Sequence, residues 1–187
     1  MKNVSNAQKI QRMSKSLKWI AAGLMIALPI IDAGYWILGG YSFLPVQIDF
    51  IPAMSAAEIP PLSQIAPLFK FYGFLISLIP VGIALIAVNS LRKLFELYEK
   101  IEIFSEKCVR HIRVFGWMLL IGQLAYPFYC ALMSLALTIS NPPGHRMIVV
   151  ALGLTQIWLI LLASSILLIS WIMEEGKKLQ EEHEATV

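Results

Sequence analysis

The chain has 187 residues, of which 58% are hydrophobic and only 14% are charged. Soluble domains carry about 25% charged residues, and disordered chains need low hydrophobicity, so this composition argues against both classes. The formal net charge of +3 is weak and does not indicate nucleic-acid binding. The deciding question is whether the apolar residues gather in runs long enough to cross a bilayer.

Four apolar runs of that length follow one another along the chain. They cover residues 19–38, 68–88, 114–139 and 147–173. A helix of about 20 apolar residues crosses a hydrocarbon core of about 30 Å, and the runs are too long for strands. The sequence therefore predicts an all-α membrane protein, with residues 1–187 forming one domain, a four-transmembrane-helix bundle.

The basic residues predict which helix ends face the cytoplasm. Five precede residue 19, six lie in the connection 89–113, and two lie in the tail 174–187, which places 13 of the 15 on one side. Cytoplasmic connections carry such an excess of Lys and Arg. We expect both termini in the cytoplasm, with the chain crossing the membrane several times. Trp19, Trp117 and Trp171 are expected at the inner interface and Trp36 at the outer one.

The two long connections differ in character. The outer connection 39–67 keeps many apolar residues, which favours either a lid over the helix ends or a surface for a ligand or partner. In the inner connection 89–113, apolar residues at three- and four-residue steps predict that the second helix continues into the cytoplasm as an amphipathic helix. A break is expected at 101–104, with Ser105 capping the next helix.

The inner connection forms either a passive interfacial elbow or a docking site for a cytoplasmic protein. The acidic tail is also expected to fold back onto the basic inner connection. The candidates for this interaction are Leu94, Phe95, Phe104, Ser105, Arg110, Arg113, Glu181 and Glu182.

Asp32 is the single acid within the apolar runs. Such a group usually faces a cavity or a charged partner. Lys70, near the outer start of the second helix, is the preferred partner, and Arg146 is the second candidate. The pair could fix helix register; alternatively, Asp32 could be a proton- or ligand-coupled carboxylate in an outward cavity, or it could face interfacial water.

Gln123 and Gln156 each lie nine residues inside their apolar runs, counted from opposite ends. Because a tight turn makes these helices antiparallel neighbours, we expect both amides near the midplane, hydrogen-bonded to each other or in contact with a substrate. Gly73 and Ser77 form a small-xxx-small step that allows close helix approach.

Motifs for nucleotide phosphate binding, zinc proteolysis and serine hydrolysis are absent, and the His and Cys residues are not spaced as metal ligands. We therefore predict that the protein is not an enzyme and has no catalytic residue, metal or cofactor; a membrane enzyme ranks third, after the two hypotheses that follow. The first hypothesis is a non-enzymatic inner-membrane protein that regulates, senses or scaffolds through its cytoplasmic connection and tail. The alternative is an oligomeric transporter or channel for a proton or small molecule. Expected partners are the lipid bilayer, a cytoplasmic regulatory protein and further copies of the chain, without direct nucleic-acid binding.

Two segments carry a resemblance to a known family. They are Leu94-Phe95, Glu102-Ile103-Phe104-Ser105 and Val109 in the inner connection, and Gly176, Leu179, Glu181-Glu182 and Thr186-Val187 in the tail. The chain resembles an uncharacterised family of small four-span bacterial membrane proteins, a domain of unknown function. Family members are often encoded beside small helix-turn-helix regulators, which implies a regulatory or sensory role. Ile101 stands where the family usually has Gly, and Ala185 where it usually has Leu.

Overall fold

The computed structural model describes residues 2–38, 65–102, 105–139, 141–142 and 144–185. Across these ranges the chain forms helices and no strand. The helices are α1 (Lys2–Leu38), α2 (Pro67–Glu99), α3 (Glu106–Thr138) and α4 (Leu154–Ala185). Each contains a segment long and apolar enough to cross a membrane. The prediction of an all-α protein with four transmembrane helices is confirmed.

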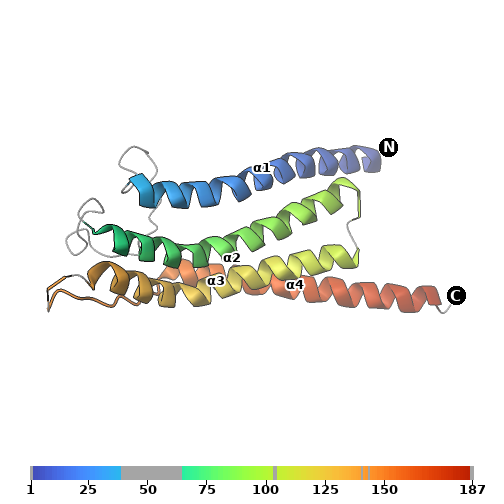
Figure 1. Cartoon of the computed structure of the whole chain (residues 1–187). Helices are drawn as coiled ribbons and strands as arrows, with labels where there is room; N and C mark the ends of the chain where they lie inside the picture. Colours follow the sequence, from blue (N-terminus) through green and yellow to red (C-terminus); the bar gives the residue numbers. More distant parts are fainter. Residues whose placement is uncertain (1, 39–64, 103–104, 140, 143, 186–187) are drawn as a thin grey trace.

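The helices lie side by side in chain order, each running opposite to the one before it (Figure 1). The main contacts join α1 to α2, α2 to α3 and α3 to α4. The first residues of α1, the connection between α2 and α3, and the last residues of α4 consequently share one end of the molecule (Figure 1). Helices α1 and α4 are the outer members of this row, and each packs mainly against a single neighbour.

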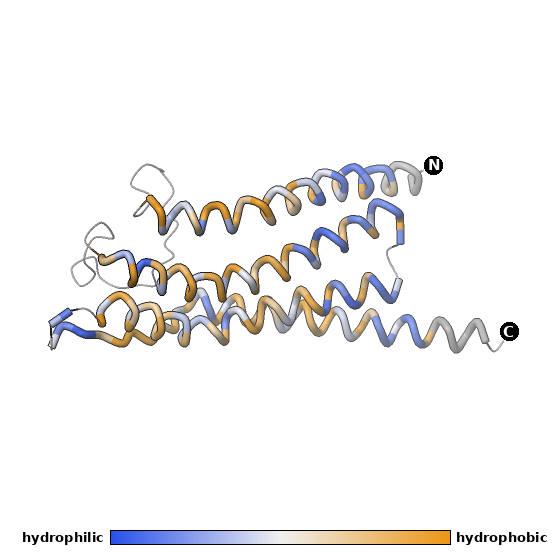
Figure 2. Tube along the Cα trace, viewed as in Figure 1, coloured by the Kyte–Doolittle hydropathy of each residue, from blue (hydrophilic) through white to orange (hydrophobic). Residues whose placement is uncertain are grey.

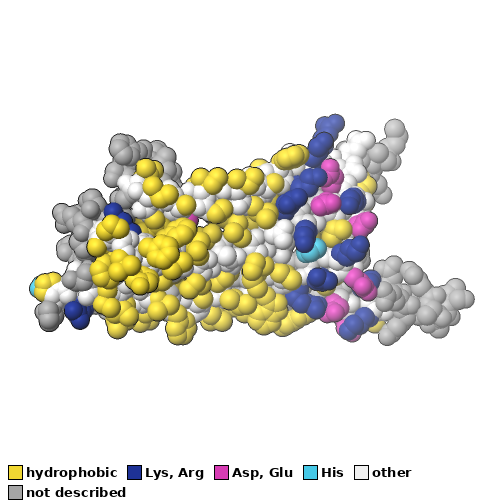
Figure 3. Space-filling model, viewed as in Figure 1, with side chains coloured by type: hydrophobic (Ala, Val, Ile, Leu, Met, Phe, Trp, Pro, Cys, Tyr) yellow, Lys and Arg dark blue, Asp and Glu magenta, His cyan; other side chains and the backbone are white. Residues whose placement is uncertain are grey.

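Polar and apolar residues separate along the helix axes. The middle of the helices is apolar, and polar residues concentrate toward the shared end (Figure 2). Figure 3 shows the Lys, Arg, Asp and Glu side chains gathered there. We call this the charged end; it is formed by the charged residues within 9–18, 92–100, 106–113 and 174–178. In the most apolar window of each helix only 17–22% of the residues are buried. The rest of that surface is apolar and needs lipid contact.

A buried cluster in the half away from the charged end holds α1, α2 and α3 together. It contains Tyr35 and Trp36 of α1, Tyr129, Cys130, Met133 and Leu137 of α3, and Ile65. The Trp36 ring lies so close to Gly73 of α2 that any side chain at position 73 would collide with it. Trp36 is only 5% exposed, so its ring packs between helices instead of facing the lipid interface. Trp19, Trp117 and Trp171 are exposed.

The fourth helix begins later than its apolar run. Residues 147–153 are not helical, and α4 starts at Leu154 rather than at Met147. Hydroxyl groups at the end of α3 explain the difference, because they accept hydrogen bonds from the backbone of this segment. The Met147 N–H donates to Thr138 Oγ1 over 3.1 Å, and the Val149 N–H donates to Ser134 Oγ over 2.9 Å. The segment therefore lies against α3 before the helix begins.

The second helix continues to Glu99, as its apolar periodicity predicts, and then ends in a Schellman motif. The Glu102 N–H donates to Leu97 O over 3.0 Å, and the Ile101 N–H donates to Tyr98 O over 3.1 Å. Ile101 has φ 63, the left-handed conformation that normally requires glycine. The expected cap is confirmed, because Ser105 Oγ accepts the Cys108 N–H over 3.2 Å at the start of α3.

Candidate functional site

The buried acid of α1 is bound to a hydroxyl group of α2. Asp32 is fully buried, and its Oδ2 lies 3.0 Å from Ser77 Oγ. Trp36 Nε1 donates to the same Ser77 oxygen over 3.1 Å. Because Asp32 and Trp36 are four residues apart, they share one face of α1 and reach Ser77 together. These three polar groups connect α1 to α2 inside the apolar part of the protein.

The expected ion pair between Asp32 and Lys70 is wrong. Asp32 Oδ2 bonds to Ser77, and Oδ1 is buried without a hydrogen-bond partner. Lys70 precedes Ser77 by seven residues, or about 10 Å along a helix. It borders a mostly apolar hollow of about 210 Å³ between α1 and α2, together with Ala33, Trp36, Ile37, Phe71 and Phe74.

Arg146 does not reach Asp32 either. It is exposed in the connection between α3 and α4, where its Nε donates to Asn141 O over 3.1 Å. What the sequence reasoning missed was a pair of neutral partners, Ser77 and Trp36. The four-residue spacing of Asp32 and Trp36 was the signal that could have found the second.

The two intramembrane amides do not form the expected pair. Gln156 lies in the first turn of α4, where its Oε1 accepts the Gly153 N–H over 3.0 Å. This is the bond by which a Gln at the third helical position caps a helix start. Gln123 lies well inside α3 and is partly exposed. Between the described residues, no hydrogen bond joins Gln123 to Gln156. Gln156 therefore stabilises a helix start rather than bridging two helices.

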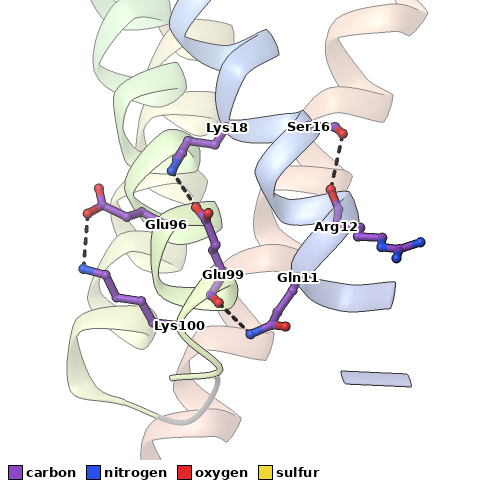
Figure 4. A network of polar contacts seen from close by, with 7 residues as sticks. All are labelled: Gln11, Arg12, Ser16, Lys18, Glu96, Glu99 and Lys100. Atoms are coloured by element: carbon purple, nitrogen blue, oxygen red, sulfur yellow. Dashed lines mark hydrogen bonds and ion pairs between the residues drawn. The ribbon is translucent and has the colours of Figure 1, made fainter. Parts of the chain in front are cut away.

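At the charged end, ion pairs join α1 to α2 and α3 to α4. Lys18 Nζ of α1 lies 2.5 Å from Glu99 Oε2 of α2, and Gln11 Nε2 donates to the Glu99 backbone oxygen over 3.2 Å (Figure 4). Between α3 and α4, Arg113 pairs with Glu174, and Lys177 Nζ lies 2.9 Å from Glu106 Oε1. These pairs are partly exposed to water, which screens the attraction between their charges, so each contributes little to stability.

The residues predicted to dock a cytoplasmic protein lie in different environments. Leu94 is buried and packs with Leu97 and Cys108, so it belongs to the α2–α3 contact. Ser105 is occupied as the cap of α3, and Arg113 pairs with Glu174. Arg110 is exposed and borders a polar hollow between α3 and α4. Phe104 and the side chains of Glu181 and Glu182 lie outside the described part of the chain.

The tail does not fold back in the described part. Helix α4 continues to Ala185 and points away from the other helices at the charged end (Figure 1). The expectation of a tail folded onto the inner connection is wrong for this helical segment, because uninterrupted helical backbone hydrogen bonds keep it straight. Glu174 nevertheless reaches the predicted base Arg113 from within the helix.

The remaining candidate, Phe95, borders an apolar groove between α1 and α2 at the charged end. This α1–α2 groove has a volume of about 430 Å³ and is lined by Ile10, Met13, Ser14, Leu17, Phe95 and Tyr98. Met13 is 66% exposed. The sequence analysis did not predict the groove, although apolar residues at positions 10, 13 and 17 have helical spacing within the basic N-terminal segment.

A family model described as "Protein of unknown function (DUF2975)" matches residues 29–187. The chain belongs to the DUF2975 family. Among curated proteins and among solved structures, none matches the chain significantly. The match includes Asp32 and Ser77 and begins after the α1 wall of the groove. Within the described ranges, His, Cys, Asp and Glu do not form any group of three that could hold a metal ion.

Proposed function

We propose that this DUF2975 protein is a non-enzymatic protein of the bacterial cytoplasmic membrane that binds a soluble regulatory protein at its charged end. The observation that carries this proposal is the apolar α1–α2 groove among the charged side chains. By the excess of Lys and Arg at this end, the groove faces the cytoplasm. Both termini then lie on the cytoplasmic side as well.

The position of the groove distinguishes it from a lipid-facing surface. Its α1 wall, residues 10–17, alternates with the exposed bases Lys9, Arg12 and Lys15. Bases at this density are not found along a lipid-exposed stretch at membrane depth, because a charge in hydrocarbon is costly. Apolar side chains such as Met13 therefore face the headgroup region or the cytoplasm, where a protein can cover them.

The chemistry of the groove selects an acidic amphipathic helix as its partner. Apolar side chains at three- and four-residue spacing would enter the groove, as in other helix-in-groove complexes. Acidic residues beside them would meet Lys9, Arg12 and Lys15, which steers association and fixes orientation. Transport is less well supported, because Asp32 is fully buried and the hollow beside Lys70 is not lined by it.

Photo-crosslinking in living bacteria tests this proposal. A photoreactive residue replaces Met13, and a matched one replaces Ile26, which is on the same helix and is similarly exposed at 65%. We expect Met13 to crosslink one defined protein and Ile26 to crosslink lipid. Phe95→Ala should weaken the Met13 product, whereas Phe71→Ala, far along α2 from the groove, should leave it unchanged. If Met13 and Ile26 both capture only lipid, the proposed function is wrong.

A further inference from the structure

The contacts of Ser77 bear on the protonation state of the buried acid. Ser77 Oγ lies 3.1 Å from Trp36 Nε1, 3.0 Å from Asp32 Oδ2 and 2.8 Å from Phe74 O. An indole N–H can only donate, and a backbone carbonyl can only accept. A serine hydroxyl has one hydrogen and two lone pairs. With an ionised Asp32, the single Ser77 hydrogen would face two acceptors, and one of these short contacts would be left without a proton.

A proton on Asp32 Oδ2 completes all three contacts. Asp32 then donates to one lone pair of Ser77 Oγ, and Trp36 donates to the other. The Ser77 hydrogen is released to bond Phe74 O. The remaining oxygen, Oδ1, is buried without a partner, and as the carbonyl oxygen of a neutral acid it costs much less than an unpaired buried charge.

Within the part of the chain that the structure describes, no cation forms an ion pair with Asp32. Lys70 of α2 and Arg146 form no ion pair with it in the described structure. Tyr35 of α1 and Tyr129 and Cys130 of α3 are the titratable side chains of the buried cluster that also contains Trp36. Tyrosine and cysteine are ordinarily neutral at pH 7. An ionised Asp32 would therefore be an unpaired charge at membrane depth, which proteins avoid.

We propose that Asp32 is a proton-binding site of the folded protein, occupied at neutral pH and held by Ser77 and Trp36. The site forms only when α1 packs against α2, because the acid and its acceptor come from different helices. Proton uptake and α1–α2 packing are coupled, so exposing this contact to water releases the proton. The site is independent of the groove and of any soluble partner.

Carbon-13 NMR of the full chain in lipid nanodiscs reads the protonation state directly. Asp32 and Asp49 are the only aspartates in the sequence. Labelling aspartate carboxyl carbons therefore gives two signals, and Asp32→Asn assigns one of them. We expect the Asp32 signal at the position of a neutral acid at pH 7. A signal at the carboxylate position overturns the proposal.

The pH dependence of unfolding gives a second readout. Asn at position 32 keeps an N–H that can donate to Ser77 but takes up no proton. In the unfolded chain Asp32 ionises above about pH 4, whereas the folded wild type retains its proton. The unfolding equilibrium constant of the wild type, relative to that of Asp32→Asn, should rise tenfold per pH unit from about pH 4 to pH 7. A ratio that stays flat over this range refutes proton binding by Asp32.

Discussion

Replacing Ile101 by glycine tests whether the turn after α2 is strained. Ile101 has φ 63 at the position after the helix cap, where its N–H donates to Tyr98 O. A branched side chain is unfavourable in this left-handed conformation, because Cβ approaches the neighbouring carbonyl oxygen. Glycine has no Cβ and adopts this conformation freely. The informative comparison is between Ile101→Gly and Ile101→Ala, because both remove the isoleucine side chain, which is 51% exposed.

The expected difference follows from two opposing effects. The left-handed conformation costs a residue with a Cβ about 1–2 kcal/mol. The greater freedom of glycine in the unfolded chain costs about 0.4–1 kcal/mol relative to alanine. Side-chain contacts of Ile101 are lost equally in both variants and cancel. The net result is a folded state of Ile101→Gly that is about 1 kcal/mol more stable than that of Ile101→Ala, or about fivefold in the unfolding equilibrium constant.

The assay is reversible unfolding in mixed micelles by titration with a denaturing detergent, followed by circular dichroism. Lys100 supplies the matched control, because it precedes Ile101 directly and has an ordinary φ of -86. There, Lys100→Ala should be more stable than Lys100→Gly by about 0.5–1 kcal/mol. If alanine exceeds glycine at both positions, Ile101 is not strained and the argument from its backbone conformation fails.

Three further predictions concern helix contacts. Gly73→Ala should destabilise the protein by about 1–3 kcal/mol in the same unfolding assay because of the collision with Trp36. Gly82→Ala, with open space around the added carbon, is its control. Equal effects of the two substitutions would contradict the close packing of Trp36 against Gly73. Thr138→Val should speed hydrogen exchange at the Met147 amide, which loses its 3.1 Å acceptor, and unchanged exchange would rule out that bond. A double-mutant cycle with Lys18→Met and Glu99→Gln should give a coupling of at most about 1 kcal/mol that shrinks with added salt, because the pair is partly exposed. A larger, salt-independent coupling would contradict screening of this pair by water.

The helices were predictable because membrane-length apolar runs leave few structural choices. Hydropathy did not locate the start of α4, since residues 147–153 are as apolar as a helix but are not helical and lie against α3. What decides their conformation is the position of Ser134 and Thr138 on another helix. Such tertiary hydrogen bonds have no signature within the segment itself.

For the candidate sites as well, the sequence predicted some features, whereas others depend on contacts between helices. An acid within an apolar run predicted that Asp32 has a special environment, and it is fully buried. Its partner was mispredicted because opposite charge was given more weight than a nearby hydroxyl group. Ser77 and Trp36 become partners only through the relative rotation of α1 and α2, which the close approach of Gly73 to the Trp36 ring allows. The groove likewise needs two helices, so the spacing of residues 10, 13 and 17 could only suggest one wall.

Because the helices lie in a row, α1 can be separated from the other three helices. Helix α1 makes most of its contacts with α2, and 28 residues of sequence separate the end of α1 at Leu38 from the start of α2 at Pro67. Without it, α2 still contacts α3, and α3 still contacts α4. Two chains lying beside each other in a membrane could therefore exchange their first helices while keeping the Asp32–Ser77 contact intact. The same geometry means that segments 1–38 and 65–187, expressed as separate polypeptides, should reassemble through that contact.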